Sequence, residues 1–149
     1  MDALIIGSSH GLADAVGAAL RRRGLSVLRA IAADARDGES AQWLLNEAGR
    51  PPLIVVVESA PYASVHELMW LTSAEIVLVA EQHAPMTRPS ALPRRRMTPR
   101  AQPGLTVVPL GRSGRRWFPL GPGRSEPMGA ERAAAVVLRS CGAEAASCR

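Results

Sequence analysis

The stretch "GSSHG" at positions 7–11 has the clearest chemical potential in this sequence. Glycine lets a backbone come close to a phosphate, and the first free N–H groups of a following helix attract anions. Here the glycines come straight after a short apolar run and straight before a helical pattern, the context that phosphate-binding turns require. The sequence therefore predicts a phosphate- or dinucleotide-binding turn. Its predicted contact residues are Gly7, Ser8, Ser9, His10, Gly11 and Leu12.

A second group of candidate residues is the stretch "GRSGRRW", which follows the last expected strand. Arg112, Arg115 and Arg116 are spaced to clamp a phosphate or carboxylate by paired hydrogen bonds, and the alternative is an exposed basic loop. Trp117 and Phe118 come directly afterwards, within an irregular pattern. Aromatic side chains in such segments often anchor a partner, so both are predicted to bind a protein partner or a second copy of the chain. The alternative is a flap packed over the chain's own sheet.

Four further polar residues are expected at the carboxyl ends of strands. His10, Glu58, Glu81 and His83 supply the side-chain types used in acid–base catalysis and in metal binding. Their spacing matches no metal motif, so we predict no metal site. The alternative is that they are polar residues on a loop face with no catalytic role.

Composition excludes some chemistry outright. The chain has 149 residues and a net charge of +5, and every one of its 18 basic residues is arginine. Without lysine there is no Schiff base and no lysine that acts as a base or a phosphate ligand. The stretch 88–124 is basic and has no acid, which suits an anionic partner but equally a solvated loop. Basic charge alone is weak support for nucleic acid binding, which we do not expect.

Two further patterns bear on the compartment. Cys141 and Cys148 stand near the C-terminus with no spacing typical of a metal site, so they are interpreted as free thiols of a cytoplasmic protein. No apolar run reaches the length of a membrane span, and the N-terminus does not resemble a signal peptide. We therefore expect no association with a membrane.

Strands and helices are expected to alternate along the chain. The apolar run "LIVVV" at 53–57 is the strongest strand signal, because a strand buried on both faces needs branched apolar residues throughout. Alternation of this kind indicates a parallel sheet with helices on both faces. The expected strands are 3–6, 26–31, 53–57, 75–80 and 105–110, and the expected helices start near 11, 39, 64 and 129.

These elements predict an α/β fold: a Rossmann-like three-layer sandwich with a parallel sheet of about five strands in the order 2-1-3-4-5. Its ligand site should lie where the strand order reverses, between the first and third strands. One domain is expected over 1–149. It should carry a mobile arginine- and proline-rich loop at about 82–103 and an irregular aromatic-containing segment at about 111–128.

The first 60 residues or so resemble the start of the short-chain dehydrogenase/reductase family. Gly7 and Gly11 match the first two glycines of the family's Gly-x-x-x-Gly-x-Gly turn, and Ala13 stands where the third would be. "ESA" after "LIVVV" is similar in placement to the family's Asn-Ala-Gly. The resemblance implies NAD or NADP as the cofactor. It does not extend to the family's catalytic Tyr-x-x-x-Lys pair, because the single tyrosine, Tyr62, is elsewhere and lysine is absent.

The acid or arginine that would select the cofactor's ribose is also missing, since Ile31 and Ala32 occupy its expected place. We therefore expect a non-catalytic, dinucleotide- or phosphate-binding accessory or regulatory protein, as a homodimer or with a protein partner. The first alternative is a small enzyme acting on a phosphorylated or carboxylated substrate. The second is a pure interaction module with a vestigial turn.

Overall fold

The structure, a computed structural model, describes residues 1–7, 10–31, 35, 37–57, 68–83, 104–113, 115–119 and 126–141, with only the backbone of residues 10, 80–83, 113 and 119. The elements run in the order β1 (Ala3–Gly7), α1 (His10–Arg22), β2 (Val27–Ala30), α2 (Gly38–Glu47), β3 (Leu53–Val57), β4 (Glu75–His83), β5 (Leu105–Ser113), β6 (Arg116–Pro119) and α4 (Ala130–Ser140). The expected alternation of strands and helices is confirmed.

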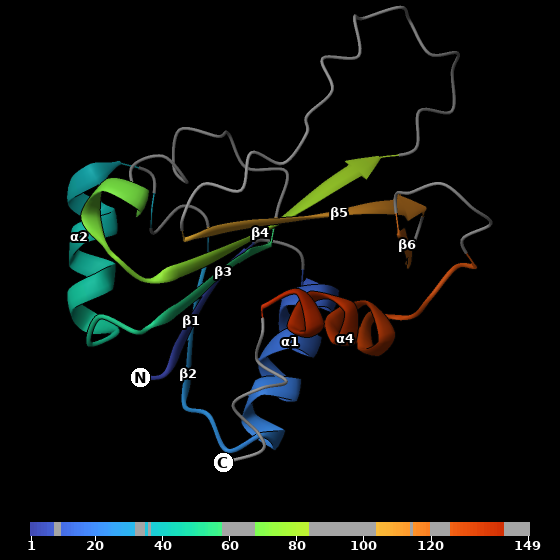
Figure 1. The fold of residues 1–149 in the computed structure, drawn as a ribbon, viewed down its shortest axis with the longest axis horizontal. Helices are drawn as coiled ribbons and strands as arrows, with labels where there is room; N and C mark the ends of the chain where they lie inside the picture. Colours follow the sequence, from blue (N-terminus) through green and yellow to red (C-terminus); the bar gives the residue numbers. More distant parts are fainter. Residues whose placement is uncertain are drawn as a thin grey trace, which may run out of the picture.

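The six strands form one sheet in the order β2-β1-β3-β4-β5-β6, and the first five are parallel (Figure 1). The predicted Rossmann-like α/β sandwich and its order 2-1-3-4-5 are thereby confirmed. Central strands carry the most apolar sequences, because both of their faces are covered: β1 is buried at every position, and β3 at four of its five.

The sixth strand was not expected. The segment 111–128, predicted to be irregular, begins inside β5 and then supplies β6, which pairs antiparallel with β5. Gly111 stands opposite Phe118 in this hairpin, and a Cβ at Gly111 would lie 2.7 Å from Cδ2 of the Phe118 ring. Glycine therefore makes room for the aromatic ring, and the pair favours a hairpin. Met128 extends it further through a bridge to Trp117.

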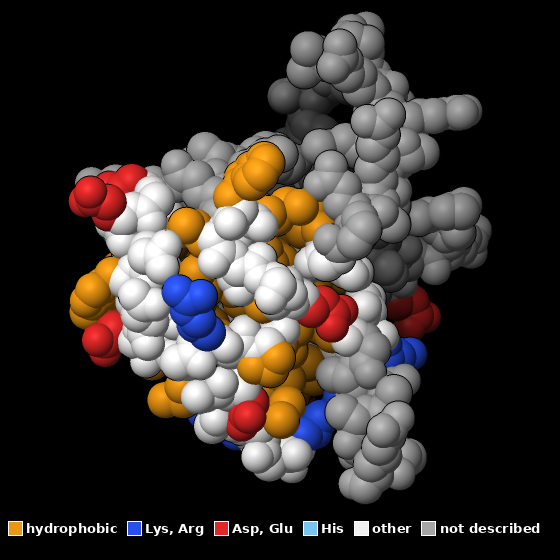
Figure 2. Space-filling model, turned by 60° about the vertical axis from the view of Figure 1, so that its left-hand side comes forward, with side chains coloured by type: hydrophobic (Ala, Val, Ile, Leu, Met, Phe, Trp, Pro, Cys, Tyr) orange, Lys and Arg blue, Asp and Glu red, His pale blue; other side chains and the backbone are white. Residues whose placement is uncertain are grey.

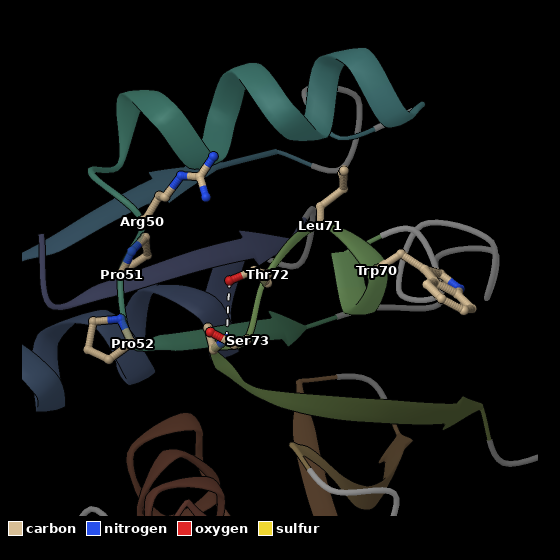
Figure 3. Close-up of a pocket in the computed structure, with 8 residues that line it drawn as sticks. Arg50, Pro51, Pro52, Trp70, Leu71, Thr72 and Ser73 are labelled. Atoms are coloured by element: carbon tan, nitrogen blue, oxygen red, sulfur yellow. Dashed lines mark hydrogen bonds between the residues drawn. The ribbon is translucent and has the colours of Figure 1, made fainter.

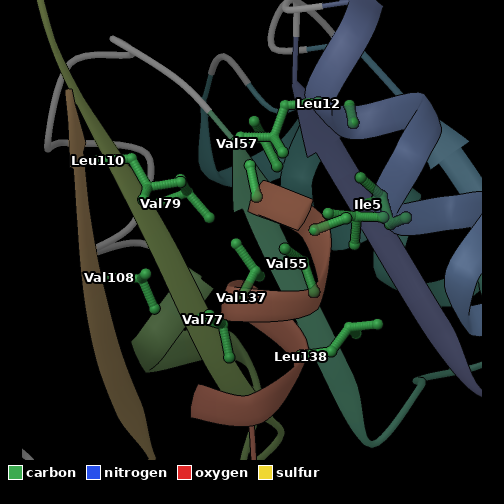
Figure 4. Close-up of a cluster of buried hydrophobic side chains, with 14 of the residues drawn as sticks. Ile5, Leu12, Val55, Val57, Val77, Val79, Val108, Leu110, Val137 and Leu138 are labelled. Carbon is green, nitrogen blue, oxygen red and sulfur yellow. The ribbon is translucent and has the colours of Figure 1, made fainter. Parts of the chain in front are cut away.

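Two apolar clusters fill the sandwich. On one face α1 and α4 pack against each other and against the sheet, with Ile5, Val55, Val77 and Val137 at the centre (Figure 4). On the other face α2 and the helical turn at 68–71 cover the strands. Figure 1 shows these helix layers on opposite sides of the sheet.

Helix α1 ends where the sequence predicts. Gly24 follows with a φ of +83°, a left-handed conformation that glycine adopts without steric cost. Asp37 caps the start of α2 by accepting a hydrogen bond from the Ser40 N–H at 2.8 Å.

Some expectations fall outside the described residues. The predicted loop at 82–103 is described at Gln82 and His83, which belong to β4. The helix expected from residue 64 is described from Leu68 to Leu71. None of the helices in the described ranges is long and apolar enough to cross a membrane.

Candidate functional site at the carboxyl edge of the sheet

The glycine turn lies at the point where the chain order of the sheet reverses. Strand β1 ends at Gly7 and α1 begins at His10, while β2 and β3 flank β1 on its two sides. Parallel sheets with this order bind ligands outside the carboxyl ends of the strands beside such a point. The N-terminus of α1 also brings free N–H groups and partial positive charge to this edge. The free N–H groups at the start of α1 thus lie at the edge of the sheet where proteins of this fold class bind ligands.

Gly7 has a packing role that does not depend on any ligand. It pairs with Val57 on β3, and a Cβ built on Gly7 would run into the Val57 carbonyl oxygen and lie 3.1 Å from the Val57 Cβ. The obstacle is backbone, which cannot rotate out of the way. A glycine is therefore required here for β1 and β3 to approach, whether or not a phosphate binds nearby.

Gly11 contacts a residue that is distant in sequence. The edge of the Trp117 indole faces it, and a Cβ at Gly11 would lie 3.2 Å from the Trp117 Cη2 atom. Arg112 lies over the ring of the same tryptophan, with its Cζ atom 5.6 Å from the indole centroid. A guanidinium group, an indole ring and the first turn of α1 are thus brought together by the β5–β6 hairpin.

Trp117 is a core residue, with 4% of its surface exposed. The partner-binding role predicted for it disagrees with this burial, because the ring is covered by the chain itself, as in the alternative of a packed flap. Its indole N–H is buried and finds no acceptor among the described residues. An unsatisfied buried donor costs about 1–3 kcal/mol, so apolar packing must outweigh that loss. Phe118 is half-buried, and its partner-binding role stays a prediction.

The three predicted arginines differ in their surroundings. Arg112 is half-buried and stacked on Trp117, whereas Arg115 and Arg116 are exposed at the hairpin turn and the start of β6. Arg112 and the first turn of α1 thus both lie against Trp117, Arg112 over the ring and Gly11 at its edge. Leu12 is fully buried, so any ligand contact there is left to its backbone.

The remaining predicted site residues are less fully described. Ser8, Ser9 and Glu58 lie outside the described residues. The backbones of Glu81 and His83 belong to β4 and pair in register with Leu110 and Arg112, and that of His10 starts α1. In the described part of the chain, no group of three or more His, Cys, Asp or Glu residues is placed to hold a metal ion.

An ion pair beside this edge was not predicted from the sequence. The Arg29 guanidinium of β2 donates to the Asp14 carboxylate of α1, which ties the second strand to the first helix. Arg29 was hidden within an expected strand, where a single charged residue is readily taken for a solvent-facing one. The signal was its position, since a partly buried arginine on an apolar strand needs a carboxylate partner.

A pocket was also missed, and it lies at the opposite edge of the sheet. It has a volume of about 600 Å³ and is lined by residues 50–52 and 70–74. These segments directly precede β3 and β4, so the pocket sits at the amino ends of those strands (Figure 3). Its sequence signals were Arg50 directly after a helix-ending glycine, and a tryptophan at position 70 outside any apolar stripe.

Cys141 has no features of a reactive thiol. It is buried, and its Sγ atom lies 3.1 Å from the Val137 carbonyl oxygen. Burial, reinforced by the negative charge of Glu75, raises the pKa of the Cys141 thiol to about 12. A thiol that stays protonated at neutral pH is a weak nucleophile. Cys141 therefore serves as a buried core residue that packs in the apolar cluster beside α4.

No protein-family model, no curated protein and no solved structure matches this chain. The arrangement of its own residues is therefore the basis on which its function is proposed.

Proposed function

We propose that the chain is a non-catalytic, Rossmann-like accessory protein that binds a phosphate-bearing ligand at the carboxyl edge of its sheet. NAD and NADP are the dinucleotides to test first, because the resemblance at residues 1–60 implies them. The observation that carries the proposal is that Arg112 and the first turn of α1 both lie against the Trp117 indole. A guanidinium group and free backbone N–H groups together favour an anion more than either alone.

A non-catalytic role is supported by composition rather than by geometry. The chain has no lysine to lower the pKa of a tyrosine or to hold a ribose, and Tyr62 lies outside the described residues. Reductase chemistry of the tyrosine–lysine type is therefore not proposed.

Calorimetric titration of the full chain with NAD, NADP, ATP and inorganic phosphate tests the proposal. We expect at least one of the four to bind with a dissociation constant below about 1 mM. Arg112→Gln should weaken that binding by about tenfold, since a charge-assisted hydrogen bond contributes roughly 1.5 kcal/mol. Arg115→Gln is the matched control, because Arg115 is exposed at the hairpin turn. Equal effects of the two substitutions would indicate general charge attraction and not a site.

Gly11→Asp is a poor test of this site. A Cβ at Gly11 would lie 3.2 Å from the Cη2 atom of Trp117, so this substitution would disturb packing as well as ligand binding. The two effects could not be separated. Arg112→Gln leaves the Gly11–Trp117 contact in place.

A second candidate is an interaction module whose glycine turn is kept for packing alone. The contacts of Gly7 with Val57 and of Gly11 with Trp117 favour it, because they explain both glycines without a ligand. If none of the four ligands binds the wild-type chain, this candidate replaces the first. Its partner would then be sought on the α2 side, where hydrophobic side chains reach the surface (Figure 2), among them Trp43 at 62% and Trp70 at 87% exposure.

A further inference from the structure

We propose that the exposed face of α2 is a docking site for an extended, arginine-rich segment of a partner protein. The site consists of three exposed side chains, Glu39, Trp43 and Glu47, which we call the α2 ridge. The inference goes beyond the proposed function and does not depend on it, because no residue of α2 belongs to the site proposed at the carboxyl edge.

The three side chains of the α2 ridge lie on one face of the helix. Residues four apart are neighbours on a helix surface, and each such step advances about 6 Å along the axis. The ridge is therefore about 12 Å long, with the tryptophan between the two carboxylates. The other face of α2 is buried through Ala41, Leu44 and Leu45, so the ridge is turned away from the core.

Trp43 is the centre of the ridge, and 62% of its surface is exposed. The ring adds little to the stability of the fold, because most of it stays in water. An exposed indole attracts the planar guanidinium group of an arginine over its face, and carboxylates on both sides add to that attraction. Figure 2 shows hydrophobic and acidic side chains together on this side of the molecule.

Neither carboxylate of the ridge makes an ion pair within the described residues. Arg50 follows Glu47 by three positions and still does not pair with it. Glu39 stands in the first turn of α2, where the helix dipole favours negative charge, but Glu47 is the last residue of the helix, where negative charge is unfavourable. Helix stability therefore does not explain Glu47, and both carboxylates are available to a cationic partner.

The local charge selects a cationic partner. Residues 37–49 include three acidic residues and no arginine, although the whole chain has a net charge of +5. A negative surface attracts a cationic segment and repels an anionic one. Arginine suits the ridge better than lysine, because its planar group pairs with a carboxylate by two hydrogen bonds and also stacks on an aromatic ring.

The spacing of the ridge sets the spacing of the arginines. In an extended chain alternate side chains point to the same side and stand about 6.6–7.2 Å apart, close to the steps of about 6 Å on α2. An Arg-x-Arg-x-Arg segment therefore places its middle guanidinium over Trp43 and the outer two beside Glu39 and Glu47. Three consecutive arginines would turn the middle side chain away from the helix.

NMR titration of the full chain tests the proposal, with the tryptophan indole and α2 amide signals as the readout. The probes are the peptide acetyl-Gly-Arg-Ser-Arg-Ser-Arg-Gly-amide, its isomer acetyl-Gly-Ser-Arg-Arg-Arg-Ser-Gly-amide, and the first peptide with lysine in place of arginine. We expect the first peptide to shift the Trp43 indole signal with a dissociation constant below about 1 mM at low salt, and the other two to bind at least about threefold more weakly. Absence of binding, or equal binding of the two isomers, overturns the proposal, since equal binding shows general charge attraction.

Substitutions then place the contact. Trp43→Ala should weaken binding of the first peptide by about fivefold, and so should the double change Glu39→Gln with Glu47→Gln. Trp70→Ala, at another exposed tryptophan, is the matched control and should change binding by less than about twofold. All these side chains are exposed, so the melting temperatures should stay within about 2 °C of the wild type, which separates loss of the site from loss of the fold.

Two results of these substitutions would contradict the proposal. Peptide binding that the ridge variants leave unchanged overturns it. Self-association of the wild-type chain in sedimentation, abolished by the same variants, would assign the ridge to a second copy of the chain and overturn the assignment to a partner protein.

Discussion

Replacing Gly7 by alanine tests whether the glycine turn is built on a packing requirement. The new methyl group would run into the Val57 carbonyl oxygen and lie 3.1 Å from the Val57 Cβ and 3.3 Å from its carbonyl carbon. All three atoms belong to a central strand that is buried on both faces, so β1 and β3 must separate locally. Overpacking of this kind costs about 1–3 kcal/mol, and a weakened ladder hydrogen bond adds about 1 kcal/mol.

The expected loss is therefore about 3 kcal/mol. For a chain of this size that lowers the melting temperature by about 6–12 °C, which calorimetry or circular dichroism resolves easily. Two glycines provide matched controls. Gly111→Ala also places a methyl group against a neighbour, but that neighbour is the half-buried Phe118 ring, which can swing aside, so about 1 kcal/mol is expected. Gly38→Ala, in the first turn of α2, meets no atom within 4 Å and should be neutral or slightly stabilising.

The order of the three variants is the test. If Gly7→Ala melts within about 2 °C of the wild type, or above Gly111→Ala, backbone obstruction is not what requires a glycine at position 7. Close approach of a ligand would then be the better explanation for it.

Three other predictions concern contacts elsewhere in the fold. Trp117→Ala should lower the free energy of unfolding, measured in urea, by about 3–5 kcal/mol. Trp117→Phe should lower it clearly less, because this change also removes the buried indole N–H, which has no acceptor among the described residues. Equal losses for the two variants would contradict this. In a Cys148→Ser background, Cys141 should react with a disulfide reagent at pH 8 far more slowly than in the unfolded chain. Its pKa is raised from 9.0 to about 12, so its contribution to stability is constant below pH 9 and falls as the pH rises toward 12; rapid reaction of the folded chain would refute its burial. The pKa of Asp2 is lowered from 3.8 by hydrogen bonds from the Ser26 side chain and backbone, so its contribution is present above pH 3.8 and is lost as the pH falls through the lowered value. Ser26→Ala should raise that pKa toward 3.8 in an NMR titration, and an unchanged value would show that the backbone contact alone sets it.

The fold was predictable because its main signals are local. A run such as "LIVVV" tolerates no position facing water, which makes it a central strand, and a glycine after the basic end of α1 marks the turn into β2. Strand order then followed from chain connectivity. The predicted ends of the strands were less accurate. Strands β4 and β5 each continue three residues beyond their predicted ends, because the two strands stay paired past the apolar core.

The β5–β6 hairpin was missed because its signals lie in contacts between distant residues. "GRSGRRWFP" has the composition of a loop, with two glycines, a proline and three arginines. What makes it a hairpin is Phe118 over Gly111 on one side and Trp117 against Gly11 on the other. Neither contact is visible until the strand order is known.

The same reasoning explains why the amino-edge pocket was overlooked. The ligand site was expected at the carboxyl edge, since α/β sheets of this order bind ligands there. The signals at the other edge are of a different kind: an arginine where the backbone favours glycine, and a tryptophan that the core does not use. Backbone strain at Arg50 lowers the stability of the folded chain, whereas Trp70 adds little to that stability because its side chain stays in water.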